Sequence, residues 1–270
     1  TLDCGTTSFN IIDKEKFLFD TIVIDHHIKD KNLPKVFSII NPNIHNEKSD
    51  YQDLAAVGVT FLFVLGLRKQ LRIKNFFKKN KILEPNLLNY LDLVALGTIA
   101  DLVPLDKNNR TMVAHGLKLI KKNKSKPGIY ALLNQAGRQL SKLTTSDLSF
   151  AVAPRLNAAG RLTDMSLGIE CLLTDDEGNA IEIAEKLNRL NTERRQIQDD
   201  MQEEALAELE KYLQNTSGEI PHSICIYNKD WHQGVVGILA SKIKEKFNRP
   251  AIVFAKENEG VLKGSARSIT

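Results

Sequence analysis

At 270 residues the chain is long enough for one large or two ordinary domains, and 42% hydrophobic and 26% charged residues are typical of a soluble globular protein. The sequence predicts neither a membrane-spanning segment nor a signal peptide, which argues against an integral membrane protein. The net charge of +4 permits a nucleic-acid partner but does not require one.

The cysteines are odd in number and show no CxxC spacing, since they occur as Cys4, Cys171 and Cys225. They are typical of reduced thiols in a cytoplasmic protein rather than of a disulfide framework or a zinc site. We therefore expect a cytoplasmic protein with no membrane association. The chain also starts without Met and ends within a β-prone run, so we expect an internal fragment of a longer protein.

The strongest early signal is the run at residues 21–27, where four apolar or β-branched residues lead directly into Asp25, His26 and His27. Such a run predicts a strand of a parallel sheet that is buried on both faces. Ligands in open α/β sheets collect at the carboxyl ends of strands, so these side chains lie where a catalytic site is expected. Carboxylate and imidazole together bind Mn²⁺, Zn²⁺ or Fe, and hard carboxylate oxygens favour Mn²⁺ or Mg²⁺. An ordinary strand end with two surface histidines is the alternative.

Two further acids are candidates for the same site. Asp3 follows a predicted strand end and would lie beside Asp25 if two parallel strands are one βαβ step apart, although a turn or helix cap would also use an Asp. Asp101 is the single acid in the apolar stretch 97–105. A buried carboxylate is costly unless it is paired or bound to metal, so we expect a ligand there, with a helix-terminal cap as the alternative.

Three elements are predicted between these acids: a strand at 36–40, a buried helix at 54–67 and an amphipathic helix at 86–96. Basic residues gather over 68–81 and again over 118–126, and both runs are interpreted as solvated surfaces.

The first basic run contains two aromatic residues, for which we consider two roles. Phe76 and Phe77 could stack on nucleic-acid bases, or they could anchor a helix to the core.

The segment at 153–162 is rich in small residues and contains Arg155 and Arg161. Small residues let a backbone approach a ligand closely, and arginine suits the recognition of phosphate. The same arginines could instead pair with structural acids.

A single long helix is predicted over residues 174–214, with Thr174 and Glu177 forming a capping box. Its length of about 60 Å at 1.5 Å per residue is too great for a compact crossover and indicates a bridge between two domains. A coiled-coil dimer is disfavoured because Arg194 interrupts the apolar stripe.

After a linker at 217–221, the pattern strand–helix–strand over 223–254 predicts a second α/β unit. The segment 260–269 then places charged and hydroxyl side chains on a Gly-containing run that could hold a phosphate, or could simply end a polar hairpin. No P-loop or GxGxxG motif occurs, so nucleotide hydrolysis of the Walker type is unsupported. The candidate phosphate ligands of the last segment are Lys263, Ser265, Arg267 and Ser268.

Together these motifs resemble those of the DHH phosphoesterase superfamily. Residues 25–27 are similar to its signature, and residues 2–5 and 97–105 resemble the motifs that precede and follow it. The segments that resemble its RecJ branch, which comprises 5′→3′ exonucleases specific for single-stranded DNA, are 153–162, the long helix, 234–238 and 264–268.

The resemblance implies an α/β fold in which a parallel-sheet DHH domain is joined by a long helix to a second, smaller α/β domain. The expected bounds are 1–173 for the DHH domain, 174–215 for the helix and 216–270 for a DHH-associated domain that binds nucleic acid. It also implies two divalent metal ions, Mn²⁺ or Mg²⁺.

Carried over to this sequence, the resemblance implies that Asp3 bridges the two metal ions and that His26 and Asp101 bind one of them. His27 would contact the scissile phosphate or help to protonate the leaving group. Asp25 would be a ligand or would orient a histidine.

On the second domain, the resemblance implies that Arg161, Ser265 and Arg267 bind the phosphate of the nucleotide. Further candidates for nucleic-acid or phosphate binding are Arg155, Lys263 and His232. Acidic residues expected before Thr1 and a Gly-Gly-His motif expected after Thr270 are absent from the sequence, so we expect weak metal binding and little or no activity.

The predicted function is therefore metal-dependent 5′→3′ hydrolysis of single-stranded DNA in recombination and repair, by a monomer. Single-strand-binding protein or a helicase are candidate partners. One alternative is a DHH-family phosphohydrolase of short oligonucleotides or small phosphate compounds, which substrate-length dependence would reveal. Another is a non-enzymatic replication scaffold, which the retained acids and histidines disfavour.

Overall fold

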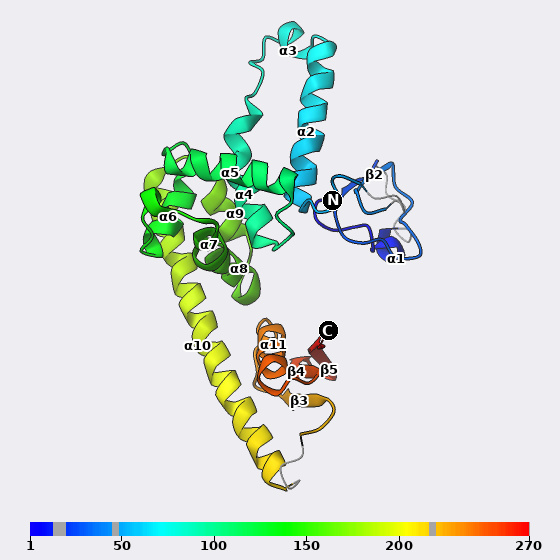
Figure 1. The fold of residues 1–270 in the computed structure, drawn as a ribbon, viewed down its shortest axis with the longest axis vertical. Coiled ribbons are helices and arrows are strands. Elements are labelled where there is room, and N and C mark those ends of the chain that lie inside the picture. Colours follow the sequence, from blue (N-terminus) through cyan, green and yellow to red (C-terminus); the bar gives the residue numbers. More distant parts are fainter. Residues whose placement is uncertain (13–19, 45–48, 216–219, 270) are drawn as a thin grey trace. The chain divides into compact units, whose positions relative to one another are not determined.

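The structure is a computed structural model that describes residues 1–12, 20–44, 49–215 and 220–269. The chain divides into two compact units, Thr1–Ala153 and Pro154–Thr270, each of which combines helices with a sheet (Figure 1). The α/β fold class is therefore confirmed. Residues 217–219 of the predicted linker lie outside the described residues.

Among the described residues, none of the helices combines the length and the apolar composition that crossing a membrane requires.

The sheet of the first unit consists of two parallel strands, β1 (Ile22–Ile24) and β2 (Ser38–Ile40). Leu2 adds a parallel bridge to Ile24 on the other side of β1. Val23 is fully buried, but Ile22 is 37% exposed, so the prediction that the whole run is buried on both faces is wrong at its first residue. The sheet is too narrow to cover it. The short helix α1 (Phe9–Ile12) lies between Leu2 and β1 in the chain.

The rest of the first unit is helical. The long helix α2 buries only its first turn, and its first residues pack on β1. The closest helix pair is α4 with α5. The helical elements are α2 (Ala56–Ile73), α3 (Phe76–Lys79), η1 (Leu87–Tyr90), α4 (Leu91–Ala100), α5 (Lys107–Lys121), α6 (Pro127–Gln135), η2 (Leu140–Lys142), α7 (Thr145–Asp147) and the π-helical η3 (Leu148–Val152).

Helix α4 corrects the sequence prediction of an amphipathic helix at 86–96. A 3-10 turn occupies residues 87–90, and the α-helix begins only at Leu91. Most of its residues are buried, including Asp92, whose carboxylate accepts hydrogen bonds from the Leu93 amide at 2.8 Å and from the Ser125 hydroxyl. A helix that is buried on most of its surface needs no polar face, so α4 is not amphipathic.

The second unit contains a three-stranded sheet in the order β3–β4–β5. The pair β3–β4 is parallel with α11 as its crossover, and β4–β5 is an antiparallel hairpin. Its elements are α8 (Ala153–Leu162), α9 (Ser166–Leu173), α10 (Glu177–Asn215), β3 (Ile224–Asn228), α11 (Val236–Phe247), β4 (Ala251–Asn258) and β5 (Val261–Arg267).

Helix α10 confirms the predicted long helix, with 39 residues or about 58 Å at 1.5 Å per residue. The predicted capping box is wrong. The Asp176 carboxylate accepts the Asn179 amide at 2.6 Å and so caps the helix, whereas the Thr174 hydroxyl accepts the amide of Asp176 itself. Aspartate is as good a cap as threonine, and its position one residue before the helix decides which of them acts.

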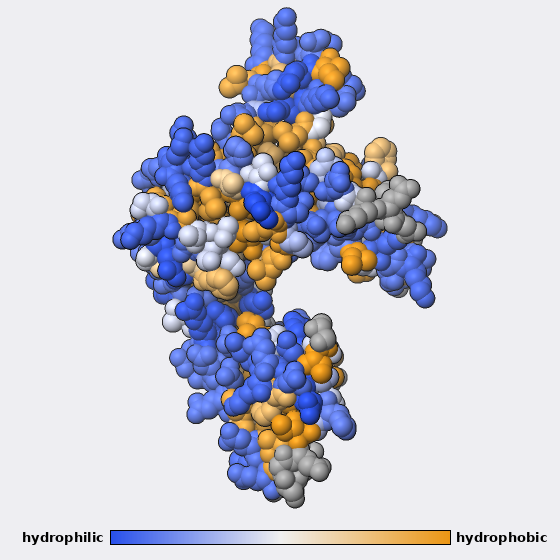
Figure 2. All heavy atoms as spheres, in the orientation of Figure 1, coloured by the Kyte–Doolittle hydropathy of each residue, from blue (hydrophilic) through white to orange (hydrophobic). Residues whose placement is uncertain are grey.

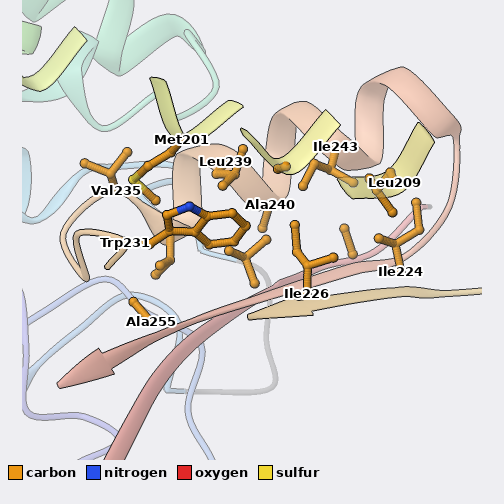
Figure 3. Packing of buried hydrophobic residues seen from close by; sticks show 14 residues of the cluster. Met201, Leu209, Ile224, Ile226, Trp231, Val235, Leu239, Ala240, Ile243 and Ala255 are labelled. Carbon is orange, nitrogen blue, oxygen red and sulfur yellow. The ribbon is translucent and has the colours of Figure 1, made fainter. Parts of the chain in front are cut away.

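The C-terminal half of α10 completes the core of the second unit (Figure 3). Met201, Ala205 and Leu209 are buried against the sheet and α11. Trp231 lies in the same cluster, and its indole nitrogen donates to the Glu204 carboxylate at 2.8 Å. The apolar face of the long helix therefore covers one side of this core.

We expect Gly116→Ala to destabilise the first unit by about 1–3 kcal/mol, the usual cost of overpacking. A Cβ at this position of α5 would lie 2.2 Å from the Leu91 carbonyl oxygen and 2.4 Å from the Ala95 Cβ. Urea unfolding measures the change. Gly66→Ala is the matched control, because α2 leaves open space around that position. There, replacing a helical glycine should stabilise the protein by about 0.4–1 kcal/mol. Equal effects of the two substitutions would contradict the proposed packing.

Candidate active site

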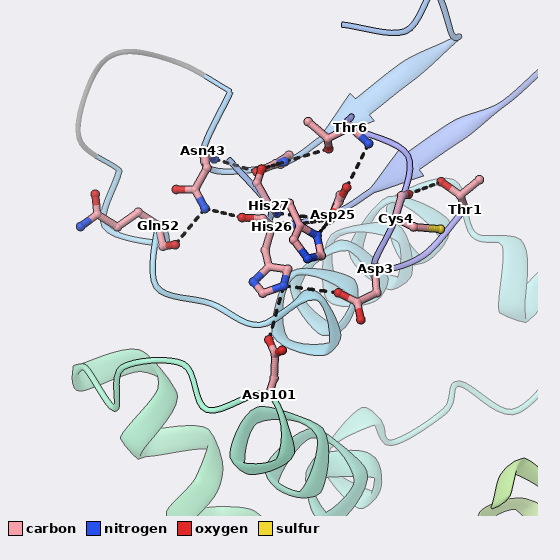
Figure 4. Close-up of polar contacts among 11 residues, drawn as sticks. Thr1, Asp3, Cys4, Thr6, Asp25, His26, His27, Asn43, Gln52 and Asp101 are labelled. Carbon is pink, nitrogen blue, oxygen red and sulfur yellow. Dashed lines mark hydrogen bonds and ion pairs between the residues drawn. The ribbon is translucent and has the colours of Figure 1, made fainter. Parts of the chain in front are cut away.

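The site is built on the Asp25 carboxylate, which is 1% exposed and follows directly after β1 (Figure 4). One of its oxygens accepts the Thr6 amide at 3.0 Å. The other accepts the backbone amides of His26 at 2.8 Å and His27 at 3.2 Å, and the Nδ1 of the His27 ring at 2.7 Å. These four donors fix the turn that carries both histidines.

This arrangement also sets the charge of Asp25. Burial alone raises the pKa of the carboxyl, but the hydrogen bonds from His27, Thr6 and His26 outweigh it. The pKa of Asp25 therefore lies well below its usual range, and the group is a carboxylate at neutral pH. In turn, the hydrogen bond to Asp25 is the main cause of a raised pKa for His27.

His26 presents an unusual buried nitrogen. Its Nε2 is buried and has no hydrogen-bond partner among the described residues. The nearest carboxylate oxygens are Asp3 Oδ1 at 3.3 Å and Asp101 Oδ2 at 3.4 Å (Figure 4). An unsatisfied buried nitrogen is costly and calls for a partner.

The donor set fits a divalent cation. Ligand atoms lie about 2.0–2.2 Å from such ions, so two ligands of one ion are separated by about 3–4 Å. The separations of His26 Nε2 from the two acids fall in this range. Ligand atoms of Asp3, His26 and His27 all lie within 4.8 Å of one another. Burial and, second, the neighbouring Asp101 carboxylate raise the pKa of Asp3, so the surroundings disfavour its ionised form, which a bound cation would stabilise.

Two acids reach the site in different ways from those expected. Asp101 is 38% exposed at the C-terminal end of α4, so the argument from a buried carboxylate is wrong for it, and Asp92 is the buried acid of that helix. Asp3 has φ of 60°, in a bend that directly follows the bridge of Leu2, with its amide donating to the Ile24 carbonyl at 2.9 Å.

Three polar residues that support the site were not identified from the sequence. The side-chain amide of Asn41 donates to the Thr6 hydroxyl at 3.0 Å and to the His27 carbonyl at 2.9 Å. The side-chain amide of Asn43 donates to the His26 carbonyl at 2.6 Å. Both asparagines follow β2, at the carboxyl edge that β1 shares, and that position was the available signal.

The remaining predicted residues lie in the second unit. The Arg161 guanidinium donates to the Gly234 carbonyl at 3.2 Å, and His232 Nδ1 accepts the Gly234 amide at 3.1 Å. A Cβ on Gly234 would lie 2.3 Å from the Arg161 carbonyl oxygen, so this glycine allows α8 and the start of α11 to meet. The structure therefore brings Arg161 and His232 to one loop.

Ser265 and Arg267 are neighbours on the same strand, β5. The Arg267 guanidinium donates to the Ser265 hydroxyl at 2.9 Å, and both lie 3.2 Å from where a Cβ of Gly237 would be. They therefore flank the first turn of α11, whose free amides favour anions.

Lys263 and Arg155 are engaged elsewhere. Lys263 pairs with Glu257 at 3.6 Å, and the Arg155 guanidinium donates to the Asn188 side chain at 3.0 Å.

Two family models match the chain. The DHH family, N-terminal domain, matches residues 1–98, and the DHHA1 domain matches residues 221–270.

Similar curated proteins share one name. The single-stranded-DNA-specific exonuclease RecJ of Salmonella typhimurium is 49% identical over all of this chain, which corresponds to 47% of that protein. The RecJ of Thermus thermophilus is 32% identical over all of this chain and 36% of that protein. The chain thus spans about half the length of these curated relatives, or less.

Solved structures that resemble this chain are also of RecJ. A crystal structure of exonuclease RecJ bound to manganese matches with a TM-score of 0.78 and 29% identity, covering all of this chain and 62% of that one. RecJ from Thermus thermophilus in complex with Mn²⁺ matches with a TM-score of 0.77 and 30% identity, covering all of this chain and 37% of that one.

We expect Asp25→Asn to destabilise the first unit by about 2–5 kcal/mol, because buried donors lose a charged acceptor. The folded pKa of Asp25 is lowered, so its stabilisation is present above about pH 4, the ordinary carboxyl value, and is lost as the pH falls further. The free energy of unfolding should therefore depend less on pH in acid for the variant than for the wild type.

Urea unfolding between pH 3 and 7 measures both effects. The exposed neighbour Asp30→Asn is the control and should change stability by less than about 0.5 kcal/mol. A variant at Asp25 that matched this control would contradict the assigned role.

Proposed function

We propose that this chain belongs to the DHH family, whose N-terminal-domain model matches residues 1–98 and is accompanied by a DHHA1 match at residues 221–270, and that it is the catalytic part of a metal-dependent exonuclease acting on single-stranded DNA. The reaction is the hydrolysis of phosphodiester bonds, in the 5′→3′ direction predicted from the family resemblance, in recombination and repair. The observation that carries the proposal is the buried His26 Nε2, which has no hydrogen-bond partner among the described residues and lies 3.3–3.4 Å from two carboxylates.

The proposed metal ligands are Asp3, His26 and Asp101. Mn²⁺ or Mg²⁺ is the proposed ion, since two similar RecJ structures contain Mn²⁺ and a third contains Mg²⁺. When bound, two such ions stabilise the attacking and leaving oxygens of a phosphoryl transfer and provide a nucleophile at neutral pH. Asp3, whose side chain is 61% exposed and whose Oδ1 lies 3.3 Å from His26 Nε2, would be shared between the two ions.

His27 and Asp25 act as a pair. Asp25 holds the His27 ring through Nδ1, which leaves Nε2 free on a side chain that is 56% exposed. His27 is therefore proposed to contact the scissile phosphate or to help protonate the leaving oxygen. Asp25 is a positioning residue, since its two oxygens are occupied by hydrogen bonds.

In the second unit, Arg161, Ser265 and Arg267 are proposed to bind phosphate, with His232, Arg155 and Lys263 as weaker candidates. Arg161 and Arg267 make hydrogen bonds to neutral groups, which leaves both guanidinium charges available to an anion. Lys263 already pairs with Glu257. The domain bounds 1–173, 174–215 and 216–270 stay predictions.

Single-stranded DNA is the proposed partner molecule. Single-strand-binding protein or a helicase, and a monomeric state, stay predictions. A cytoplasmic location is proposed from the cysteines, which are odd in number and show no CxxC spacing.

The test of the function compares wild type, His26→Ala and the control His115→Ala, an exposed histidine on α5. Each is made in a protein extended at both ends, because little or no activity is expected of residues 1–270 alone. Each is incubated with labelled single-stranded DNA, duplex DNA or pyrophosphate, with Mn²⁺ or EDTA. We expect Mn²⁺-dependent release of mononucleotides from single strands only, reduced more than about 100-fold in His26→Ala, because even outer-shell changes at metal sites cost up to that factor. The control should match the wild type.

Hydrolysis of pyrophosphate or short oligonucleotides alone would replace this proposal with a small-substrate phosphohydrolase. An undiminished rate in His26→Ala would refute the assigned ligand. No turnover in any case, with DNA still bound, would favour a scaffold.

We expect Arg267→Gln to reduce the slope of log affinity against log salt concentration by about 0.7 for single-stranded DNA in EDTA, the value for one phosphate contact. The exposed Lys256→Gln on the neighbouring strand β4 removes the same charge and should leave the slope unchanged. Fluorescence anisotropy at several salt concentrations measures both. Equal salt slopes for the two variants would show that Arg267 does not contact a phosphate of the bound strand.

A further inference from the structure

The larger of the two basic runs of the chain lies in the segment 68–84, which we name the basic arm. It contains seven basic residues and one acid, whereas the rest of the chain has more acids than bases. The arm comprises the end of α2, the helix α3 and the segment that returns toward η1 (Figure 1). Its basic residues are Arg68, Lys69, Arg72, Lys74, Lys78, Lys79 and Lys81.

The shape of the arm is fixed by its own contacts. Asn75 and Lys81 have φ of 53° and 52°, and these two left-handed residues reverse the chain on either side of α3. Glu84 accepts two hydrogen bonds at 3.0 Å from the Nε of Arg72, and it lies 3.6 Å from the Nε of Arg68. The single acid therefore binds the two arginines and joins the return segment to α2.

The five lysines of the arm are not paired with Glu84, which binds the two arginines. Each is exposed, and none makes an ion pair with any residue that the structure describes. Five like charges held near one another without counter-charges are unfavourable unless an anionic partner binds them. The lysines are therefore available to such a partner.

The arm also exposes apolar side chains between its charges. Ile73 is 63% exposed, Phe76 40% and Leu83 91%, and none of the residues of α3 is buried. Phe76 and Phe77 contact each other edge to face, with centroids 5.9 Å apart, rather than packing into the core. The reading of these rings as core anchors is therefore disfavoured. Figure 2 shows the hydrophilic surface of the tip interrupted by such hydrophobic patches.

We propose that the basic arm is a binding surface for single-stranded nucleic acid, where lysines contact the phosphates and Phe76 stacks on a base. The proposal rests on the proposed function and extends it to a second contact along the strand. Exposed aromatic rings interleaved with lysines are the composition of single-strand surfaces that lack sequence preference. The lysines are dispersed on both sides of the rings rather than gathered into a pocket, which favours an extended polyanion over an acidic peptide.

The arm is distant from the candidate active site. Val59 of α2 packs against Ile24 of β1, and Ile73 lies fourteen residues further along the same helix, about 21 Å away at 1.5 Å per residue. A dinucleotide bound at the site would be too short to reach the arm. Substrate length therefore separates the effect of the arm from the chemistry.

The test is the triple substitution Lys74→Gln, Lys78→Gln and Lys79→Gln in the full chain. Binding of a 5′-labelled single strand of about 20 nucleotides is measured by anisotropy in EDTA, where no hydrolysis occurs, at several salt concentrations. Loss of three phosphate contacts should lower the salt slope by about 2 and weaken binding about 100-fold at 0.1 M salt. Phe76→Ala should weaken binding about 5- to 100-fold and leave the salt slope unchanged, as the loss of base stacking requires.

The matched control is Lys121→Gln, Lys122→Gln and Lys124→Gln, three exposed lysines at the end of α5. It removes the same total charge, so an equal fall in slope would show a general field effect and overturn the proposal. An unchanged slope in the arm variant would also overturn it and would leave an acidic protein as the partner. Hydrolysis of a dinucleotide should be the same in the arm variant and wild type. If the protein extended at both ends hydrolyses nothing, the proposed function fails, while the binding measurement still decides the role of the arm.

Discussion

The candidate site depends on one buried carboxylate. Asp25 lies at the end of β1 with its two oxygens occupied by hydrogen bonds from three backbone amides and one imidazole. Burying a charge this completely is tolerated because four donors converge on the two carboxylate oxygens. The arrangement converts the end of a strand into a rigid turn that orients His26 and His27. Asn41 and Asn43 hold the carbonyls of that turn from the opposite side.

The second consequence of this turn is the position of His26. Its ring is directed between Asp3 and Asp101, which come from a bend near the N-terminus and from the end of α4. Neither acid satisfies Nε2 by a hydrogen bond, so the structure concentrates negative charge around an unpaired nitrogen. This combination is unfavourable for a structural role and favourable for a divalent cation, which supports the proposed activity.

Much of this could be predicted from the sequence, because the signals were local. The run at 21–27 contains both the strand and its polar end, and the apolar stripe of α10 repeats along most of the helix. The predictions that were wrong concerned environment. Asp101 follows an apolar stretch, but its helix ends there and exposes it, whereas Asp92 looks like a surface acid of an amphipathic helix and is buried. The roles of Thr6 and Asn41 depend on a contact across 35 residues of sequence, which no local pattern records.

The glycine at position 116 has a consequence beyond packing. It lets α5 approach the backbone of α4 at Leu91 and Ala95, and Asp101 is the cap residue at the C-terminal end of α4. Because a helix moves as a rigid body, the spacing between these two helices also sets how far the Asp101 carboxylate reaches toward His26. The volume of the side chains where α4 and α5 cross therefore also determines the geometry of the acids at the site. Sequence drift in this core would be constrained by metal affinity as well as by folding, even at positions that never contact the ion.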